Sequence, residues 1–378
     1  MNRPGNRPGI RAQRGFTLIE LMVALLVSSL LVGMILAIFS RMSLAYRGQQ
    51  QIAGVQQILA AARAAIELDA KQAGLGMPQG FKTAITDLAL QSPVQVTNAS
   101  NAPDQVALFY ADTSAQAKLT QAIPPWTNPV TFDDASSFKA GDLVVLTTAS
   151  TAANPLSTAL PDIATYDACV LKIATVPVAT QVTFDTTAPW GTIFTHCTNT
   201  VQFRTMMYRF VAHAYRIDPT GVLQRGETGG LLGNDEVWTP LALGFSDLQT
   251  AVRMYDPTSA TDLDNDTDPN RNWFSSAAQD AMTRRAVPTM SRTALLGMSI
   301  SLVAHTDRNV EGVATPATPD LIGPPPPAPV NAANNSIGDR PSTPLPAVPA
   351  DPLLPGQRIY RWTTFQVDFR NLGVGVAL

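Results

Sequence analysis

The longest apolar run of the chain lies near its N-terminus. Between Phe16 and Phe39 the only charged residue is Glu20. At about 1.5 Å of rise per residue, a helix over this run is roughly 36 Å long, which is enough to cross a hydrocarbon core of about 30 Å. We therefore expect a membrane-spanning helix over residues 16–39. A carboxylate near the start of such a helix is costly. It implies either a partner or a place among the lipid headgroups, helped by the helix dipole.

The helical pattern continues beyond the apolar run. Residues 40–73 contain no proline, and apolar or small side chains recur at steps of three and four, which places them on one helix face. These positions are Ile52, Val55, Leu59, Ala62 and Ile66. Gly74, Gly76 and Pro78 then end the helix. The pattern predicts one helix over residues 16–73.

From about residue 79 the apolar period changes to two, which is typical of strands. The predicted strands are 105–110, 142–148, 168–176, 181–185, 201–218, 221–225, 248–255, 294–305 and 358–369. A short helix is expected only around 275–286. The sequence therefore predicts an α+β fold in which a long N-terminal helix packs on a β-rich domain over residues 79–378.

A proline-rich segment interrupts this domain. Residues 314–355 contain thirteen prolines, including four in a row from Pro324 to Pro327. Such a stretch favours extended polyproline II and cannot continue a sheet ladder. Because it lies between two predicted strands, we expect a surface insertion. It is either a disordered loop or a docking ligand.

The basic residues before the apolar run predict the orientation of the chain in the membrane. Arg3, Arg7, Arg11 and Arg14 precede the span, so the positive-inside rule puts residues 1–15 in the cytoplasm and the domain on the far side of the inner membrane. The basic segment ends at Gly15. Cleavage after Gly15 would create a new α-amine at Phe16, a cation able to neutralise Glu20 in the same chain or in a neighbour.

Together, the basic leader, Gly15-Phe16-Thr17-Leu18-Ile19-Glu20 and the apolar run resemble the class III signal of type IV pilins and type II secretion pseudopilins. The resemblance implies that a prepilin peptidase cleaves between Gly15 and Phe16 and that the Phe16 amine is methylated. It implies that Glu20 pairs with the N-terminus of an adjacent subunit during assembly. An ordinary secretory signal is cut after its apolar core, whereas here the apolar helix would stay on the mature protein.

Later segments are similar to PilW-type minor pilins. They are the strand 208–217 with 221–225 after it, the segment Leu243-Gly244-Phe245-Ser246-Asp247-Leu248-Gln249, the strand 295–306, and the terminal stretch from Tyr360 to Leu372. The third departs from the family pattern, since His305 and Thr306 replace its basic ending. The resemblance implies a partner set of major pilin, other minor pilins and the inner-membrane assembly platform.

Cys169 and Cys197 are the only cysteines. On the predicted topology they lie in an oxidising compartment, where disulfides persist. A bridge between them would close a loop of about 29 residues and contribute roughly 3.5 kcal/mol in the chain-entropy model. Two unpaired thiols are the alternative.

An acidic loop is the one candidate metal site. Asp262, Asp264, Asp266 and Asp268 alternate along it, and carboxylates two residues apart can converge on calcium. The motif departs from an EF-hand, because Thr267 replaces the glycine and Trp273 the bidentate glutamate. A solvated acidic loop is the alternative, and no other cofactor is expected.

The sequence gives little support for catalysis or nucleic-acid binding; the small basic cluster of Arg284, Arg285 and Arg292 is either a solvated face or a DNA contact, and the solvated face is favoured. His196, His213 and His305 share no triad or ligand spacing, and no phosphate-binding or nucleophile motif is present. His213 lies in a predicted strand, where a structural role is favoured. The net charge of −3 gives no basic excess for nucleic acid.

The sequence thus predicts a non-enzymatic minor pilin of a type IV pilus. It would sit in the inner membrane with its domain in the periplasm, prime pilus assembly and stay near the tip. A minor pseudopilin of a type II secretion system has the same N-terminus and is one alternative. A tip adhesin that uses the acidic loop or the proline-rich segment is another.

Overall fold

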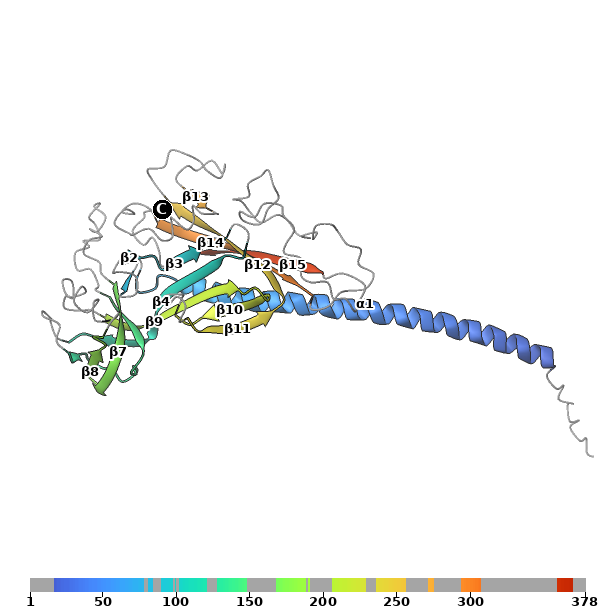
Figure 1. The fold of residues 1–378 in the computed structure, drawn as a ribbon, viewed down its shortest axis with the longest axis horizontal. Coiled ribbons are helices and arrows are strands. Elements are labelled where there is room, and N and C mark those ends of the chain that lie inside the picture. The colour runs from blue at the N-terminus through green and yellow to red at the C-terminus, as the bar shows by residue number, and fades with distance from the viewer. Residues whose placement is uncertain are drawn as a thin grey trace, which may run out of the picture. The chain divides into compact units, whose positions relative to one another are not determined.

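A computed structural model shows a long helix followed by a β-rich region (Figure 1). The chain divides into two compact units, Met1–Ile52 and Ala53–Leu378. The residues that the structure describes are 17–77, 81–83, 90–97, 99, 102–120, 128–147, 168–187, 190, 206–228, 236–255, 271–274, 294–306 and 359–369. The predicted α+β architecture, a long N-terminal helix with its later part packed on a β-rich domain, is confirmed.

The helix α1 runs over Leu18–Gln72, close to the predicted 16–73. It ends where predicted, because Gly74 and Gly76 adopt φ of 80° and 76°, a region that L side chains rarely occupy. A Cβ at Gly76 would also lie 2.6 Å from Cβ of Ala111. Only glycine therefore lets the chain leave the helix so close to the sheet.

The larger sheet has eleven strands, in an order that runs β11-β10-β9-β6-β7-β1-β2. Strand β4 pairs with β9 and β3, and β8 pairs with β7 and β5; only the β1–β7 pair is parallel among the pairs described. The strand bounds are β1 Phe81–Thr83, β2 Leu90–Gln91, β3 Val94–Thr97, β4 Gln105–Lys118, β5 Val130–Thr131, β6 Leu143–Thr147, β7 Ala168–Val178, β8 Gln181–Phe184, β9 Met206–Ile217, β10 Val222–Gly226 and β11 Trp238–Leu243.

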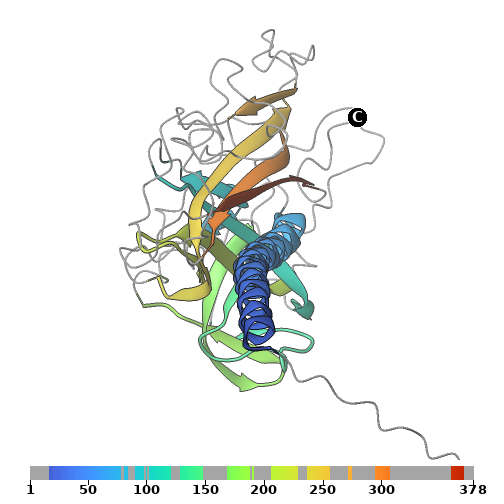
Figure 2. The same ribbon diagram turned by 90° about the vertical axis from the view of Figure 1, so that its right-hand side faces the viewer.

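The smaller sheet is antiparallel, in the order β13-β12-β14-β15. Its strands are β12 Phe245–Tyr255, β13 Arg271–Phe274, β14 Ala294–His305 and β15 Tyr360–Asp368. Figure 2 shows β12, β14 and β15 side by side. Asp104 is hydrogen-bonded to the middle of β12: its carboxylate accepts from the Thr250 amide at 2.9 Å, and its own amide donates to the Leu248 carbonyl at 2.7 Å.

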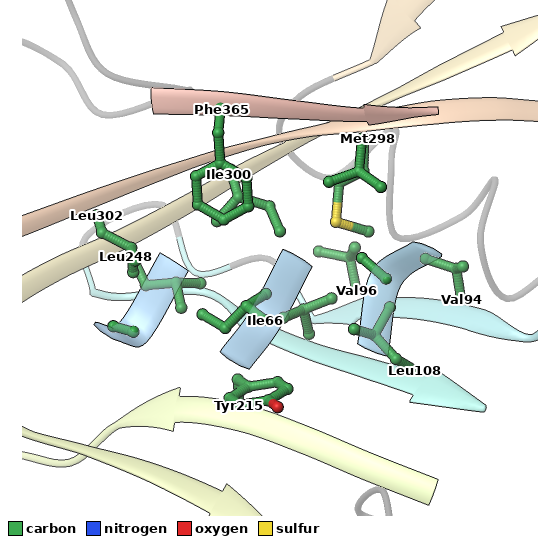
Figure 3. Packing of buried hydrophobic residues seen from close by; sticks show 14 of the residues in the cluster. Ile66, Val94, Val96, Leu108, Tyr215, Leu248, Met298, Ile300, Leu302 and Phe365 are labelled. Carbon is green, nitrogen blue, oxygen red and sulfur yellow. The ribbon is translucent and has the colours of Figure 1, made fainter. Parts of the chain in front are cut away.

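The main core lies where the second part of α1 meets both sheets. The helix buries Val55, Leu59, Ala62 and Ile66, four of the five positions of the predicted stripe, together with Ala70 and Ala73. Figure 3 shows Ile66 with Tyr215 of β9 on one side and Ile300 and Phe365 of the smaller sheet on the other. Burying such side chains contributes about 1.5–3 kcal/mol each, so this stripe holds the helix to the sheets.

Two further cores lie within the larger sheet. One surrounds Phe81, Phe109 and Phe210, whose ring centroids are 4.9–5.9 Å apart. The other gathers the ends of β4, β6, β7 and β8 around Phe132 and Phe184. Strand β9 separates the first of these from the helix, because its side chains alternate between the two faces.

Most predicted strands match observed ones, but the short strands β1, β2, β3, β5 and β13 were not predicted, and three longer strands also differ from the prediction. Strand β4 extends to Lys118, beyond the predicted Tyr110, because it continues past a bulge between Asp112 and Gln116. The edge strand β11 was not predicted, because it contains Pro240. Strand β12 begins at Phe245, three residues before the predicted Leu248. The helix expected around 275–286 and the insertion 314–355 lie outside the described residues.

Candidate functional site

The first turn of α1 holds Glu20 by a capping box. The Glu20 carboxylate Oε2 accepts hydrogen bonds from the Thr17 amide and the Thr17 hydroxyl, each at 2.9 Å. In return, the Glu20 amide donates to Thr17 Oγ1 at 3.3 Å. This reciprocal arrangement of a Thr and a Glu three residues later satisfies two amides that the helix leaves free. The Thr17–Glu20 spacing is visible in the sequence, but the prediction of a partner for Glu20 did not use it.

Glu20 makes no ion pair with any residue in the described part of the chain. It is exposed, and so are the side chains that follow it up to Phe39. The helix is long and apolar enough to cross a membrane, judged by length and composition, and none of its most apolar segment is buried. An apolar helix exposed on all sides requires lipid or other protein around it. The first unit therefore presents one carboxylate on a surface that is incomplete in the single chain.

The predicted cleavage site next to it is not described. Gly15 and Phe16 lie outside the described residues, as does the leader 1–15. Cleavage after Gly15, methylation of Phe16 and pairing of Glu20 with an N-terminal amine therefore stay predictions.

The remaining candidate sites are described in part at most. Cys169 is buried at the start of β7 and is disulfide-bonded. Cys197 lies outside the described residues, so the Cys169–Cys197 pairing stays a prediction. Asp262, Asp264, Asp266 and Asp268 also lie outside, and the calcium site stays a prediction with them. Within the described residues no group of three or more His, Cys, Asp or Glu side chains is arranged to hold a metal ion.

A second carboxylate of α1 forms a cluster that the sequence analysis missed. Asp69, in the last turns of the helix, is only 5% exposed. Its Oδ1 accepts from the Tyr110 hydroxyl at 3.0 Å, and its Oδ2 accepts from the Tyr215 hydroxyl at 2.5 Å. The same Oδ2 is 2.6 Å from Nδ1 of His213. We call Asp69, Tyr110, His213 and Tyr215 the Asp69 cluster. His213, for which the sequence favoured a structural role, thus has Asp69 as its hydrogen-bond partner.

The backbone explains why these residues meet. Tyr110 lies on β4, and His213 and Tyr215 lie two positions apart on β9, so all three face the helix side of the sheet. Asp69 follows Ile66 by three residues and so continues the apolar stripe of the helix. An acid on an otherwise apolar helix face is the signal that could have found the cluster, because a buried carboxylate needs hydrogen-bond partners.

The cluster shifts the pKa values of its members. Burial raises the pKa of Asp69, but hydrogen bonds from His213, Tyr215 and Tyr110 together outweigh burial and hold this pKa below its ordinary value. Burial and the nearby Asp69 charge raise the pKa values of Tyr110 and Tyr215 above their ordinary range. Asp69 is thus ionised and both tyrosines are neutral at neutral pH, which suits a fixed attachment of helix to sheet.

The comparisons with known proteins concern mainly the N-terminus. Residues 10–36 match the family model of the prokaryotic N-terminal methylation motif. A solved structure with a similar chain is the type IV-like pilin TTHA1219 from Thermus thermophilus. It is 11% identical, with 84% of this chain and 97% of that chain covered at a TM-score of 0.35, a likeness on which no argument rests. The search of curated proteins finds no match. The chain thus carries the methylation motif, and the matched residues include Gly15, Phe16 and Glu20.

Proposed function

We propose that the chain is a minor pilin of a type IV pilus. The observation that carries the proposal is the methylation motif at residues 10–36, followed by a helix whose exposed apolar segment bears the single acid Glu20. In this proposal the protein works by docking. Peptidase cleavage after Gly15 frees the Phe16 amine, which is methylated in a separate step. Glu20 then pairs with the amine of a neighbouring subunit, and the apolar helices bundle.

The capping box fits the role of Glu20 in the monomer. A carboxylate on a membrane helix is costly when it has no partner. Thr17 supplies two hydrogen bonds but no positive charge, so the Glu20 charge stays uncompensated until a cation arrives. A methylated α-amine of another subunit is such a cation. A pair of this kind sets subunit register, whatever its net contribution to stability.

The location and partners follow from the same proposal. Four arginines precede the span, so the N-terminus lies in the cytoplasm and the β-rich domain in the periplasm before assembly. The proposed partners are the prepilin peptidase, the inner-membrane assembly platform, the major pilin and other minor pilins of the PilW set. The proposed final position is near the pilus tip.

The test replaces Glu20 by alanine in the bacterium that carries the chain. We expect Glu20→Ala to abolish pulldown of the other minor pilins and to lower the number of pili per cell, with the protein still present in the membrane. Glu67→Ala is the matched control, because Glu67 is an acid of the same helix that already pairs with Arg63 and Lys71 at 3.1 and 2.7 Å. Unchanged assembly in Glu20→Ala would refute the proposal.

A second measurement tests processing. Mass spectrometry of the N-terminal peptide should show a chain that begins at N-methylated Phe16. A Gly15→Val variant should retain residues 1–15. Measuring secretion alongside piliation separates the pilus from a type II secretion system: loss of secretion with normal pili would assign the chain to the latter.

A further inference from the structure

His213 lies between two carboxylates that come from different elements. Its Nδ1 is 2.6 Å from Oδ2 of Asp69 on α1, and its Nε2 is 3.9 Å from Oε2 of Glu227, just after β10. An ionised carboxylate only accepts hydrogen bonds, so Nδ1 carries a hydrogen. The remaining question is whether Nε2 also carries one. If it does, the imidazole is a cation between two anions; if it does not, the imidazole is neutral.

The charged groups around His213 leave an excess of negative charge when the imidazole is neutral. On α1 there is Asp69. On β4 there are Tyr110, whose ring centroid is 6.2 Å from that of His213, and Asp112. Tyr215 on β9 is neutral. Arg225 on β10 binds Glu227 at 3.0 Å, and Arg209 lies 3.8 Å from Asp112. The two arginines pair with Glu227 and Asp112, and Arg225 also acts on Asp69 through its charge, but the groups hydrogen-bonded to Asp69 are Tyr110, Tyr215 and His213.

His213 is also accessible to protons. Its side chain is 16% exposed, whereas that of Asp69 is 7% exposed, so the imidazole is more open to solvent than the carboxylate. The unperturbed titration of an imidazole falls near neutral pH. The pKa of Asp69 is lowered by its hydrogen bonds, so Asp69 stays ionised in that range.

We propose that the Asp69 cluster is a proton-dependent clasp between the last turns of α1 and the strands β4 and β9. With Nε2 protonated, His213 joins Asp69 and Glu227 and the helix end is held most tightly. Loss of that proton removes the only cation in contact with Asp69 among the described residues, and the clasp loosens. This inference does not depend on the proposed function, because it concerns only the attachment of the helix to its own sheet.

Loosening should be local. The segment after the helix is also fixed by backbone hydrogen bonds, from Gly74 N to the Phe109 carbonyl at 2.9 Å and from Ala111 N to the Leu75 carbonyl at 2.8 Å. The effect is thus expected in the opening of residues 66–77 and not in global unfolding. Hydrogen exchange resolves such local opening.

The experiment measures hydrogen exchange by mass spectrometry on the full chain in detergent micelles, corrected for intrinsic exchange rates. Between pH 5.5 and pH 8 we expect protection of residues 66–77 to fall about two- to fivefold, the range of a partly exposed ion pair. His213→Gln should remove this pH dependence, and Glu227→Gln should reduce it. The control is His305→Gln, which changes the other described histidine, on β14, and should retain the full effect.

A second measurement covers the case in which His213→Gln fails to fold. Side-chain nitrogen resonances of the three histidines can be followed in the wild-type chain, with His196→Gln and His305→Gln variants for assignment. We expect His213 to be a cation at pH 5.5 and neutral at pH 8. A His213 that keeps one charge state throughout, or a pH effect that survives in His213→Gln, would overturn the clasp.

Discussion

Glu20, at the start of α1, and Asp69, near its end, differ in how much of their bonding the single chain completes. Asp69 has three donors from two strands and is almost fully buried. Glu20 has one partner, its own capping residue, and is exposed on an apolar surface. The difference teaches how to interpret a charge on an apolar helix: an acid whose partners are all in the chain attaches the helix to its domain, whereas an acid left with only a cap is available to another molecule.

The largest effect is expected from removing the completed acid. Asp69→Ala leaves two tyrosine hydroxyls and one imidazole without their acceptor, and breaking a buried charged network of this kind costs about 3–5 kcal/mol. We expect the unfolding midpoint of the β-rich region to fall accordingly in urea titrations of the full chain in micelles. Glu20→Ala should leave that midpoint unchanged. Equal loss in both variants would contradict the contrast between the two ends.

The second-largest loss of stability is expected from a substitution in the apolar stripe of α1. Ile66 is fully buried between the sheets, so Ile66→Ala should lower the free energy of unfolding by about 3 kcal/mol. Leu26, on the same helix, is 65% exposed, and Leu26→Ala should leave the unfolding of the β-rich region unchanged. The pair is matched in chemistry and separates the packed part of the helix from the uncovered part. A large effect of Leu26→Ala on that unfolding would show that the division is wrong.

Below about pH 4, where the Asp69 carboxylate itself takes up a proton, acid should weaken the attachment of α1 at Asp69. Its pKa is lowered from the ordinary value of 3.8 by hydrogen bonds from His213, Tyr215 and Tyr110, which outweigh burial. The folded state therefore binds this proton less readily than the unfolded state, and the stabilisation is present above pH 3.8 and is lost as pH falls through the folded pKa. We expect a steeper loss of stability below pH 4 in the wild-type chain than in Asp69→Asn. Parallel curves would assign the acid response to other carboxylates.

The smallest effect concerns Gly54, at the start of the packed part of the helix. No atom lies within 4 Å of a Cβ built on it, so an added methyl group meets nothing. Gly54→Ala should raise the free energy of unfolding by up to about 1 kcal/mol through helix propensity alone. Thermal unfolding of the wild-type chain and of Gly54→Ala measures this difference. A lower unfolding temperature in Gly54→Ala would mean that another group covers this position.

The sequence predicts elements well where local chemistry decides them. The apolar run, the stripe up to Ile66 and the two glycines Gly74 and Gly76 define α1, and the strands predicted at 201–218 and 221–225 are observed as the antiparallel pair β9 and β10. Strand β11 was missed for a physical reason. Pro240 is tolerated there because β11 is an edge strand. Its Trp238 is also held by Arg216, whose guanidinium lies 3.7 Å from the ring centroid.

The two candidate sites, Glu20 and the Asp69 cluster, also differ in how far the sequence predicts them. Glu20 and its motif are contiguous, so they can be identified from sequence alone. The Asp69 cluster joins residues 41 to 146 positions apart, and their convergence depends on the register of β4 with β9. Without that register an acid on the stripe signals only that some partner is needed.

In the smaller sheet, the end of β14 lies beside the start of β15. Strands β14 and β15 pair as far as His305 and Tyr360, and Thr306 N donates to the Ile359 carbonyl at 3.0 Å. Thr306 and Ile359, the described residues on either side of 307–358, are thus hydrogen-bonded neighbours. The entropic cost of closing a loop depends only weakly on the length of the loop and rises by about 0.6 kcal/mol per doubling. A change in the length of the segment between Thr306 and Ile359 is therefore expected to alter the entropy of closing β14 on β15 by only a small amount.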